Sequence, residues 1–309
     1  MIPPRVLVTG AGGLVGQAVV RRLGQWPGAD LLATGHAATV PARGLAGGTI
    51  ALDVTDAAAV ERAFQDFAPG VVVHCAGTAQ VEACEADRAA CWALNVDATA
   101  TLAAACRRHG ARMVLLSTDF VFSGAAGPYA ETDRPDPAST YGRTKLAAEN
   151  ALVAARLPAF AVVRTTLVYG APEGERVRSD LVRWLVGEMS QGRPVRVASD
   201  QTRTPTYDDD LADGVARVVL GGKAGLFHIA GRELASPLDV AHTVADVFGL
   251  DPALITPATT AELHPGAPRP LRGGLLILRA ESELGYRPRP LATRLADLRD
   301  RLAATAGTG

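Results

Sequence analysis

Two side chains that can exchange a proton stand four positions apart near the middle of the chain. Tyr141 and Lys145 lie in the run Tyr-Gly-Arg-Thr-Lys, and residues at this spacing share one face of a helix. With five tyrosines and two lysines in 309 residues, chance gives about 0.03 such pairs. Because arginine supplies all other basic positions except Lys223, the lysine at 145 indicates a need for a compact ammonium group.

This pair is suited to proton transfer at a carbonyl group. The pKa of a phenol is about 10, and a nearby ammonium together with an oxidised nicotinamide lowers it toward neutrality. Tyr141 can then give a proton to a carbonyl oxygen as hydride arrives, or accept one in the reverse direction. Lys145 can also hold the ribose hydroxyls of the cofactor. Thr118 ends an apolar run and offers a hydroxyl to the same carbonyl, whereas Asn95 either orders the site or is a solvated helix residue.

The elements that position these residues alternate between short apolar strands and longer helical patterns. This alternation predicts an α/β fold, a Rossmann-type doubly wound parallel sheet with helices on both faces. Ligands then bind at the carboxyl edge of the strands. The expected strands cover 5–9, 31–34, 49–52, 71–74, 112–117 and 160–165, and the expected helices cover 13–23, 56–67, 85–109 and 139–156.

The rhythm loosens after Gly170, which predicts a smaller C-terminal substrate-binding lobe. We expect an NAD(P)-binding domain at 1–170 and 207–231, and the lobe at 171–206 and 232–309. Residues 256–270 are rich in Pro, Thr and Ala and are expected to form a loop. Further helices are expected at 178–191, 208–220, 237–249 and 291–303, with extended segments at 195–198 and 226–230.

A glycine-rich turn follows the first expected strand. Gly10, Gly13 and Gly16 have the spacing GxxGxxG, and they lie between a strand and a helix. In that place one glycine allows the tight turn, one lets the backbone approach a pyrophosphate, and one lets the helix pack on the strand. The helix N-terminus then faces the phosphates. This predicts a dinucleotide-binding loop.

The adenosine end of the cofactor is indicated by two positions. Asp53 follows the third strand and can accept a hydrogen bond from an adenine amino group, while Asp56 is expected to cap the next helix. The second strand ends at His36 without the acid that usually binds a free ribose. Because Arg43 follows nearby, NADP(H) is favoured and NAD(H) stays open.

Composition excludes several classes of partner. The formal net charge is -1, so no basic excess indicates a nucleic-acid partner. The four cysteines form no CxxC pair or zinc spacing and are expected to be reduced structural thiols. No charged leader or long apolar run is visible, so we expect a cytoplasmic protein without a membrane partner. Asp208–Asp210 is expected to open a helix rather than hold a metal, and His74 and His228 are expected to be structural.

Together these motifs resemble the extended short-chain dehydrogenases/reductases, and among them the dTDP-4-dehydrorhamnose reductases. The resemblance implies an NAD(P)H-dependent reductase of a 4-keto group on a nucleotide-linked deoxysugar, with a homodimer as one assembly that the sequence allows. It is carried by the glycine loop, His74–Gly77, Val81-Glu82, Asn95-Val96, Ser117–Gly124, Pro128–Glu131, Tyr141–Leu146, Arg164, Val168–Gly170, Asp200-Gln201, Pro205–Tyr207, Asp210–Ala212 and Arg269-Pro270.

The resemblance also implies roles for individual residues. Thr118, Tyr141 and Lys145 match a catalytic triad. We expect substrate contacts from Asp119, Phe120, Arg203 and Arg269, with Phe120 standing where the family usually has Tyr. The expected cofactor contacts are Gly10, Gly12, Gly13, Leu14, Val15, Gly16, His36, Asp53, Val54, Ala76, Gly77, Asn95, Tyr141 and Lys145.

Other functions remain open on the sequence alone. A 4,6-dehydratase is disfavoured because that family places Asp-Glu after the catalytic Thr, whereas this chain has Asp119-Phe120. An epimerase with tightly held NAD, or a reductase of a non-nucleotide ketone, fits the same motifs. So does a non-catalytic NADP-binding regulatory subunit like that of methionine adenosyltransferase, which keeps the Tyr-Lys pair. That family tends to carry adjacent arginines where this chain has Ala37-Ala38.

Overall fold

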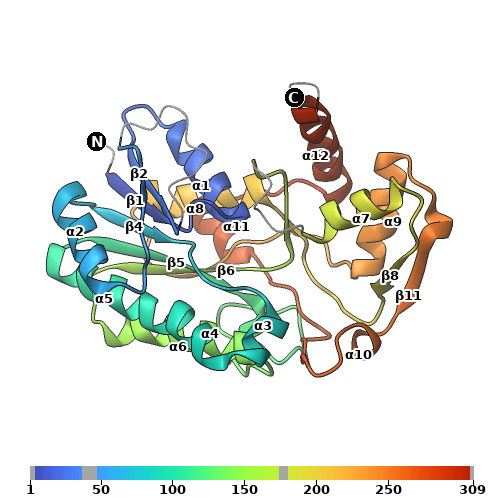
Figure 1. Cartoon of the computed structure of the whole chain (residues 1–309), viewed down its shortest axis with the longest axis horizontal. Coiled ribbons are helices and arrows are strands. Elements are labelled where there is room, and N and C mark those ends of the chain that lie inside the picture. Colours follow the sequence, from blue (N-terminus) through green and yellow to red (C-terminus); the bar gives the residue numbers. More distant parts are fainter. Residues whose placement is uncertain (1–3, 37–46, 174–179, 307–309) are drawn as a thin grey trace.

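The computed structural model describes residues 4–36, 47–173 and 180–306, and within them seven parallel strands form one sheet (Figure 1). The strand order is β10-β6-β5-β4-β1-β2-β3, so the chain reverses direction across the sheet between β1 and β4. This is the predicted doubly wound Rossmann-type sheet, and it is confirmed. The strands are β1 (Arg5–Thr9), β2 (Asp30–Gly35), β3 (Thr49–Ala51), β4 (Val71–His74), β5 (Arg112–Thr118), β6 (Phe160–Thr165) and β10 (Gly225–His228).

Helices cover both faces of the sheet because its strands are apolar on both sides. Along β1, Val6 and Val8 belong to one buried cluster and Leu7 to the other. The face that carries Val6 is covered by α1 (Leu14–Gly24), α8 (Asp208–Leu220) and α11 (Leu278–Leu284). The opposite face is covered by α2 (Ala57–Phe67), α5 (Ala98–His109) and α6 (Thr140–Ala154) (Figure 1).

The long helix expected at 85–109 is wrong in its first half. The structure has α3 (Val81–Ala86), α4 (Arg88–Trp92) and a π-helical turn (Ala93–Asp97) before α5. Asp87 divides the segment, since its side chain accepts a hydrogen bond from the amide of Ala90 and so starts a new helix. A π turn is a common feature of functional sites, and this one carries Asn95.

The helical run Arg88–His109 is long and apolar enough to cross a membrane, judged by length and composition alone. Half of its most apolar window is nevertheless buried inside the molecule. Leu102, Ala103 and Cys106 lie in the core beneath the sheet and are fully buried. The run is therefore a core helix of this domain.

A smaller lobe lies beside the carboxyl edge of the sheet (Figure 1). The expectation of a loop at residues 256–270 is wrong for 256–263, where β11 and α10 lie, whereas 264–270 contain no helix or strand. Pro257 and Thr256 are exposed while Ile255 and Ala258 are buried, so β11 lacks the alternation that marks a strand in sequence. The lobe contains α7 (Leu181–Met189), β8 (Val195–Ala198), α9 (Pro237–Phe248), the 3-10 turn Pro252–Leu254, β11 (Ile255–Ala258), α10 (Thr260–Leu263) and α12 (Leu291–Ala306).

The expected lobe at 232–309 includes a stretch that packs elsewhere. Leu275, Ile277, Ala280 and Tyr286 belong to the buried cluster on the sheet, next to α8. Residues 275–286 thus return to the Rossmann domain before α12 re-enters the lobe. Two short strands, β7 (Val168–Tyr169) and β9 (Thr206–Tyr207), pair where the chain passes between the two parts.

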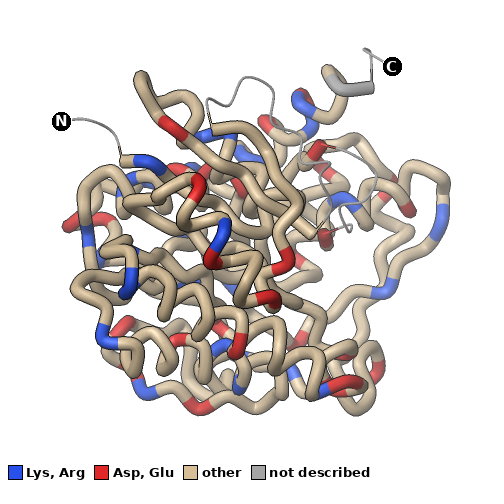
Figure 2. Tube along the Cα trace, turned by 60° about the vertical axis from the view of Figure 1, so that its left-hand side comes forward, with Lys and Arg blue, Asp and Glu red and all other residues tan. Residues whose placement is uncertain are grey.

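Asp208–Asp210 opens α8, as predicted, and its carboxylates pair with arginines. Asp208 and Asp209 lie within ion-pair distance of Arg21 and Arg301, and Asp210 pairs with Arg294. Burial is the main reason that the pKa of Asp208 rises to about 6. Among the described residues no group of three His, Cys, Asp or Glu side chains could hold a metal. Figure 2 shows basic and acidic positions interspersed along the chain.

Candidate active site

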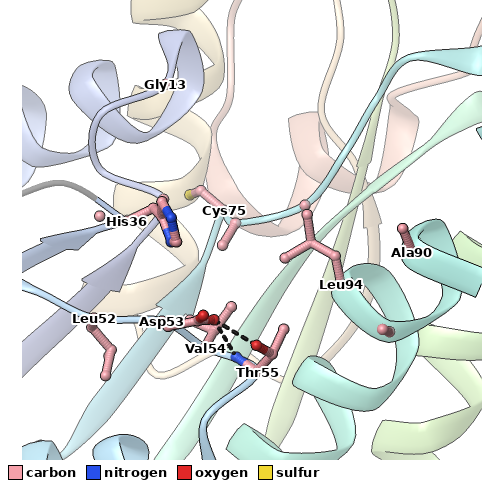
Figure 3. Close-up of a pocket in the computed structure, with 14 residues that line it drawn as sticks. Gly13, His36, Leu52, Asp53, Val54, Thr55, Cys75, Ala90 and Leu94 are labelled. Atoms are coloured by element: carbon pink, nitrogen blue, oxygen red, sulfur yellow. Dashed lines mark hydrogen bonds between the residues drawn. The ribbon is translucent and has the colours of Figure 1, made fainter. Parts of the chain in front are cut away.

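Two adjoining cavities follow the carboxyl edge of the sheet and share the glycine loop and the segment after β4. One, the larger or adenosine cavity of about 570 Å³, reaches His36 and Asp53 (Figure 3). The other, the catalytic cavity of about 450 Å³, reaches Tyr141 and Lys145 on α6 and extends to the C-terminal lobe. Both are lined by Gly10, Gly13, Cys75, Ala76 and Gly77. The structure therefore brings the predicted cofactor and catalytic residues to one continuous edge.

The glycine loop has little room for side chains at two positions. Gly10 has a φ of +67°, and a Cβ there would lie 2.5 Å from the amide nitrogen of Ala76. A Cβ on Gly16 would lie 2.1 Å from the carbonyl oxygen of Gly10. Gly13 begins α1 without a side-chain cap, so the first amide groups of that helix face the cavity. This cradle fits a dinucleotide phosphate.

Gly12 differs from its neighbours in the loop. A Cβ built on Gly12 would meet no atom within 4 Å. Leu14 and Val15 line the catalytic cavity directly after it, at the start of α1. Packing therefore demands glycine at the first and third positions of GxxGxxG, whereas the space beside Gly12 is open.

Asp53 and His36 face each other across the larger cavity, between the ends of β2 and β3 (Figure 3). Oδ1 of Asp53 accepts hydrogen bonds from the amide (2.9 Å) and the hydroxyl (2.7 Å) of Thr55, and these bonds lower the pKa of the carboxyl group. Val54 lies beside Asp53 in the lining. Asp56 caps α2 by accepting from two amides, as predicted. Arg43 and Ala37-Ala38 lie outside the described residues.

Tyr141 and Lys145 lie one turn apart in the first half of α6 and line the catalytic cavity. Ser139 caps this helix by accepting a hydrogen bond from the amide of Gly142 (3.1 Å). Thr118 is the last residue of β5 and lines the same cavity, where its hydroxyl accepts a hydrogen bond from the amide of Phe120 (3.2 Å). The triad expected from sequence is therefore assembled in one place.

The expected lowering of the tyrosine pKa requires a bound oxidised nicotinamide, and it stays a prediction. In the protein alone, burial raises the pKa of Tyr141 to about 12, outweighing the lowering effect of the Thr118 hydroxyl, and Asp119 raises it further. Burial also lowers the pKa of Lys145 to about 8, although Glu149 and Cys75 raise it. Both effects have one cause, since a site that excludes water disfavours the charged form of each group.

Glu149 is a buried carboxylate that the sequence reasoning missed. It lies one turn beyond Lys145 on α6 and accepts hydrogen bonds from Nε (2.9 Å) and Nη2 (2.6 Å) of Arg164. The hydroxyl of Ser117 donates a third bond at 2.5 Å. The signal available in sequence was an acidic residue on the buried face of the helix, at the same four-residue spacing as the Tyr-Lys pair.

Asn95 orders the site, and its alternative as a solvated residue is wrong. It is 1% exposed. Its Oδ1 accepts from the amide of Thr78 (2.9 Å), while Nδ2 donates to the carbonyl of Thr78 (3.1 Å) and to the hydroxyl of Thr144 (3.0 Å). It also lies directly behind Gly77, where a Cβ would be 2.8 Å from Oδ1. These contacts hold the cavity wall in place from behind, and a direct cofactor contact by Asn95 stays a prediction.

The four expected substrate residues all line the catalytic cavity. Asp119 follows β5 in a 3-10 turn (Asp119–Val121), and its Oδ2 is 3.4 Å from Nε of the buried Arg203. The ring of Phe120 meets Tyr141 edge-on at 5.5 Å, and the guanidinium of Arg203 lies 5.5 Å from the centre of the same ring. Charged and apolar groups thus line one small space.

Arg269 reaches the cavity from the C-terminal lobe. It is paired with Glu82 of α3, and His264 lies 3.0 Å from the same carboxylate oxygen. Together these three side chains join the lobe to the Rossmann domain at the mouth of the cavity.

The expectation of reduced cysteines is wrong for two of the four. Cys84 and Cys91 form a disulfide between α3 and α4, while Cys75 and Cys106 are free thiols. The break at Asp87 folds α4 back beside α3, which brings cysteines seven positions apart into bonding distance. His74 and His228, expected to be structural, are both buried, and a ring nitrogen of His74 lies 2.7 Å from the hydroxyl of Thr9.

Comparison with known proteins places the whole chain in one family. Residues 4–304 match the family described as RmlD substrate binding domain. A probable dTDP-4,6-dihydroxy-2-methyloxan-3-one 4-ketoreductase from Streptomyces antibioticus is 38% identical over 301 residues, covering 96% of this chain and 91% of that protein. Methionine adenosyltransferase 2 subunit beta from Danio rerio is 33% identical over 285 residues, covering 90% of this chain and 84% of that protein.

A solved structure agrees with these relatives. The dTDP-4-dehydrorhamnose reductase from Clostridium acetobutylicum superposes with a TM-score of 0.84 at 29% identity, covering 96% of this chain and 99% of that one. The extended reductase fold expected from the glycine loop and the Tyr-Lys helix is thereby confirmed. The chain belongs to the RmlD substrate binding domain family, and its predicted kinship with the dTDP-4-dehydrorhamnose reductases is confirmed.

Proposed function

We propose that this protein reduces the 4-keto group of a dTDP-linked deoxysugar with NADPH. The observation that carries the proposal is the convergence of Thr118, Tyr141 and Lys145 on one cavity of about 450 Å³. The glycine loop borders that cavity on one side, and Arg203 and Arg269 border it on another. A nicotinamide and a charged sugar nucleotide can therefore meet at Tyr141.

The chain's own contribution to the reaction is to hold and deliver a proton. A bound nicotinamide cofactor supplies the hydride. Because the pKa of Tyr141 is about 12, its hydroxyl keeps its proton at neutral pH and can donate it to the oxygen of the carbonyl. The positive charge of Lys145, one helical turn away, favours the phenolate that remains. Thr118 lines the same cavity and offers its hydroxyl to the same carbonyl oxygen.

The preference for NADP(H) rests on the end of β2. His36 is exposed there and lines the adenosine cavity, where an acid would repel a 2′-phosphate. Asp53 stands across from it with an open carboxylate for the adenine amino group. Equilibrium titration with NADPH and NADH tests this preference, and a tighter Kd for NADH would contradict it.

The sugar-nucleotide assignment rests on the charges and the apolar wall at the lobe side. Arg269 and Arg203 bring two guanidinium groups to the cavity, and such groups bind phosphates in a bidentate manner. Phe120 and Val81 provide an apolar surface in the same lining. In a dTDP-linked 6-deoxy sugar, the methyl group of the sugar can contact that surface, and the diphosphate of the nucleotide can bind the guanidinium groups.

The experiment is NADPH oxidation with a dTDP-4-keto-6-deoxyhexose, compared with the UDP-linked sugar and with the free 4-keto sugar. We expect turnover that requires the nucleotide and is fastest with dTDP. Turnover of the free sugar at an equal kcat/KM would favour a simple ketone reductase. Absence of turnover with every nucleotide sugar would end the proposal.

One observation favours a second candidate, a regulatory NADP-binding subunit. The relative from Danio rerio is named as a subunit of methionine adenosyltransferase 2 and aligns with most of this chain. Fold and motif do not fix function, because such a subunit can keep the same cofactor site. Binding of NADPH without any turnover, together with a stable complex with a methionine adenosyltransferase, would favour this candidate.

The cytoplasmic location and the homodimer remain predictions that accompany this function. Both are open to direct measurement by cell fractionation and by light scattering of the purified protein. A scattering mass near that of one chain would contradict the homodimer.

A further inference from the structure

The Cys84–Cys91 disulfide lies against the catalytic tyrosine. Its two Cα atoms are 5.2 Å apart, and the cysteines are 0% and 2% exposed. They belong to a small buried cluster with Val81 and Tyr141, and Phe120 packs against this cluster. A covalent bond that can be made and broken thus borders the residue proposed to donate the proton.

Cys91 contacts the groups that hold the Tyr-Lys helix. Its Sγ lies 3.5 Å from the hydroxyl of Thr144 and 3.5 Å from Nδ2 of Asn95. Thr144 immediately precedes Lys145, and Asn95 fixes the cavity wall at Thr78. A movement of Cys91 is therefore transmitted to α6 and to the wall.

Cys84 lies on α3, a short helix that contacts Arg269 on one side and the start of α6 on the other. In α3, Glu82 pairs with Arg269 at the lobe side. Glu85 accepts bonds of 2.7 Å from both the amide and the hydroxyl of Thr140, the residue before Tyr141. A helix of six residues is too short to be stable alone, so α3 depends on tertiary anchors, and the disulfide to α4 is the covalent one among them.

We propose that the Cys84–Cys91 disulfide is a redox-sensitive positioning device for Tyr141 and Arg269, active in its oxidised form. On reduction, a dithiol gives two electrons and two protons to the sulfur–sulfur bond, which becomes two thiols, and the dithiol itself becomes a disulfide. The activity readout rests on the reductase function proposed above, while the structural readout does not.

The size of the effect follows from distances. Two thiols cannot approach as closely as two bonded sulfur atoms, so reduction moves α3 and α4 apart by about 1 Å or more. A misplacement of about 1 Å can cost on the order of 100-fold in rate. We expect kcat/KM to fall roughly 10- to 100-fold, with a lower kcat through Tyr141 and a higher KM through Arg269. Disulfides of cytosolic proteins are usually transient, which suits a sensor in the expected compartment.

The test compares oxidised and reduced forms of the same protein. Full oxidation should leave two free thiols in denaturant, those of Cys75 and Cys106, and exhaustive dithiothreitol should give four. The reduced form should show the lower kcat and the higher KM, and reoxidation should restore both. Identical kinetic constants at two and at four thiols, or four thiols after oxidation, would overturn the proposal.

Matched variants separate this disulfide from other cysteine chemistry. The Cys84→Ser/Cys91→Ser double variant should have the kinetic constants of the reduced form and ignore dithiothreitol. The Cys75→Ser/Cys106→Ser variant has its own basal activity because Cys75 lines both cavities, but dithiothreitol should lower that activity by the same factor as in the wild type. A response that disappears in the second variant and persists in the first would assign it to the free thiols and overturn the proposal.

Amide hydrogen exchange supplies a readout that needs no substrate. Reduction should speed exchange in residues 78–95 and 139–145, because the anchor between α3 and α4 is lost. If no nucleotide sugar is turned over but this exchange difference is present, the proposed function fails and the positioning role stands. Equal exchange in both forms would sink the positioning role, whatever the activity.

Discussion

Replacing Glu149 by glutamine tests how α6 keeps Lys145 charged. Lys145 has a pKa of about 8 because it is buried, and the carboxylate of Glu149 raises that value. Without this carboxylate the pKa of Lys145 falls below its wild-type value. Its charge is lost as the pH rises through the pKa, so the alkaline limb of kcat/KM moves to lower pH. Tyr141, with a pKa of about 12, stays protonated over this range.

The same substitution has a cost in stability that the structure lets us size. The side chains of Arg164 and Glu149 are 4% and 9% exposed and are joined by two hydrogen bonds. Breaking one side of a buried pair costs about 3–5 kcal/mol. Because native proteins are stable by about 5–15 kcal/mol, Glu149→Gln should unfold at a much lower urea concentration.

Two companion variants separate stability from the effect on Lys145. Arg164→Met/Glu149→Gln removes both buried charges, so it should recover most of the stability and keep the shifted alkaline limb. Ser117→Ala removes one hydrogen bond to the carboxylate, worth about 1.5–3 kcal/mol, and should keep the limb near its wild-type position. Urea unfolding and pH profiles of kcat/KM measure both quantities. A wild-type limb in the double variant would refute the reasoning.

Three further substitutions test the cofactor and substrate ends of the site. Gly16→Ala should lose about 1–3 kcal/mol in the free energy of unfolding and most NADPH binding, because its Cβ meets Gly10. Gly12→Ala should keep a free energy of unfolding within about 0.5 kcal/mol of the wild-type value. Equal melting temperatures for the two variants would count against the cradle. His36→Asp should shift the ratio of Kd values toward NADH by about tenfold, or 1.4 kcal/mol, and an unchanged ratio would contradict its place near the 2′-phosphate. Phe120→Ala should raise the KM for a 6-deoxy sugar nucleotide at least about fivefold, since it removes the apolar ring that lines the cavity, and an equal or lower KM would contradict the apolar wall.

The strands of the sheet were predictable because their signal is local. The bounds of β4 (Val71–His74) and β6 (Phe160–Thr165) agree with the sequence prediction at both ends. Each is a short apolar run that is buried on both faces and bounded by turn residues, which is the pattern of a central parallel strand.

The helical segment before β5 was not predictable in the same way. An Ala-rich composition favours a continuous helix, yet Asp87 divides it and a π turn follows at Ala93–Asp97. The balance is set by tertiary contacts, above all by the bonds of Asn95 to Thr78 and Thr144. Intrinsic propensity does not contain those contacts.

The residues of the site also differ in whether a local sequence signal reveals them. Tyr141, Lys145 and Thr118 could be found because spacing or position at a strand end reveals them. The partnership of Glu149 with Arg164 and the Cys84–Cys91 bond could not, since each depends on which elements pack together. The upward shift of the tyrosine pKa in the protein alone could not be predicted either, because the degree of burial is a property of the fold.

The central claim is that Tyr141 donates the proton to a carbonyl of a nucleotide sugar. The most direct measurement is the kcat of wild type and of Tyr141→Phe with NADPH and a dTDP-4-keto-6-deoxyhexose, alongside the Kd for NADPH. We predict that kcat falls by about 10²- to 10⁴-fold while the Kd for NADPH stays unchanged, because only the proton donor is lost. A kcat for Tyr141→Phe within tenfold of the wild-type value would contradict the claim.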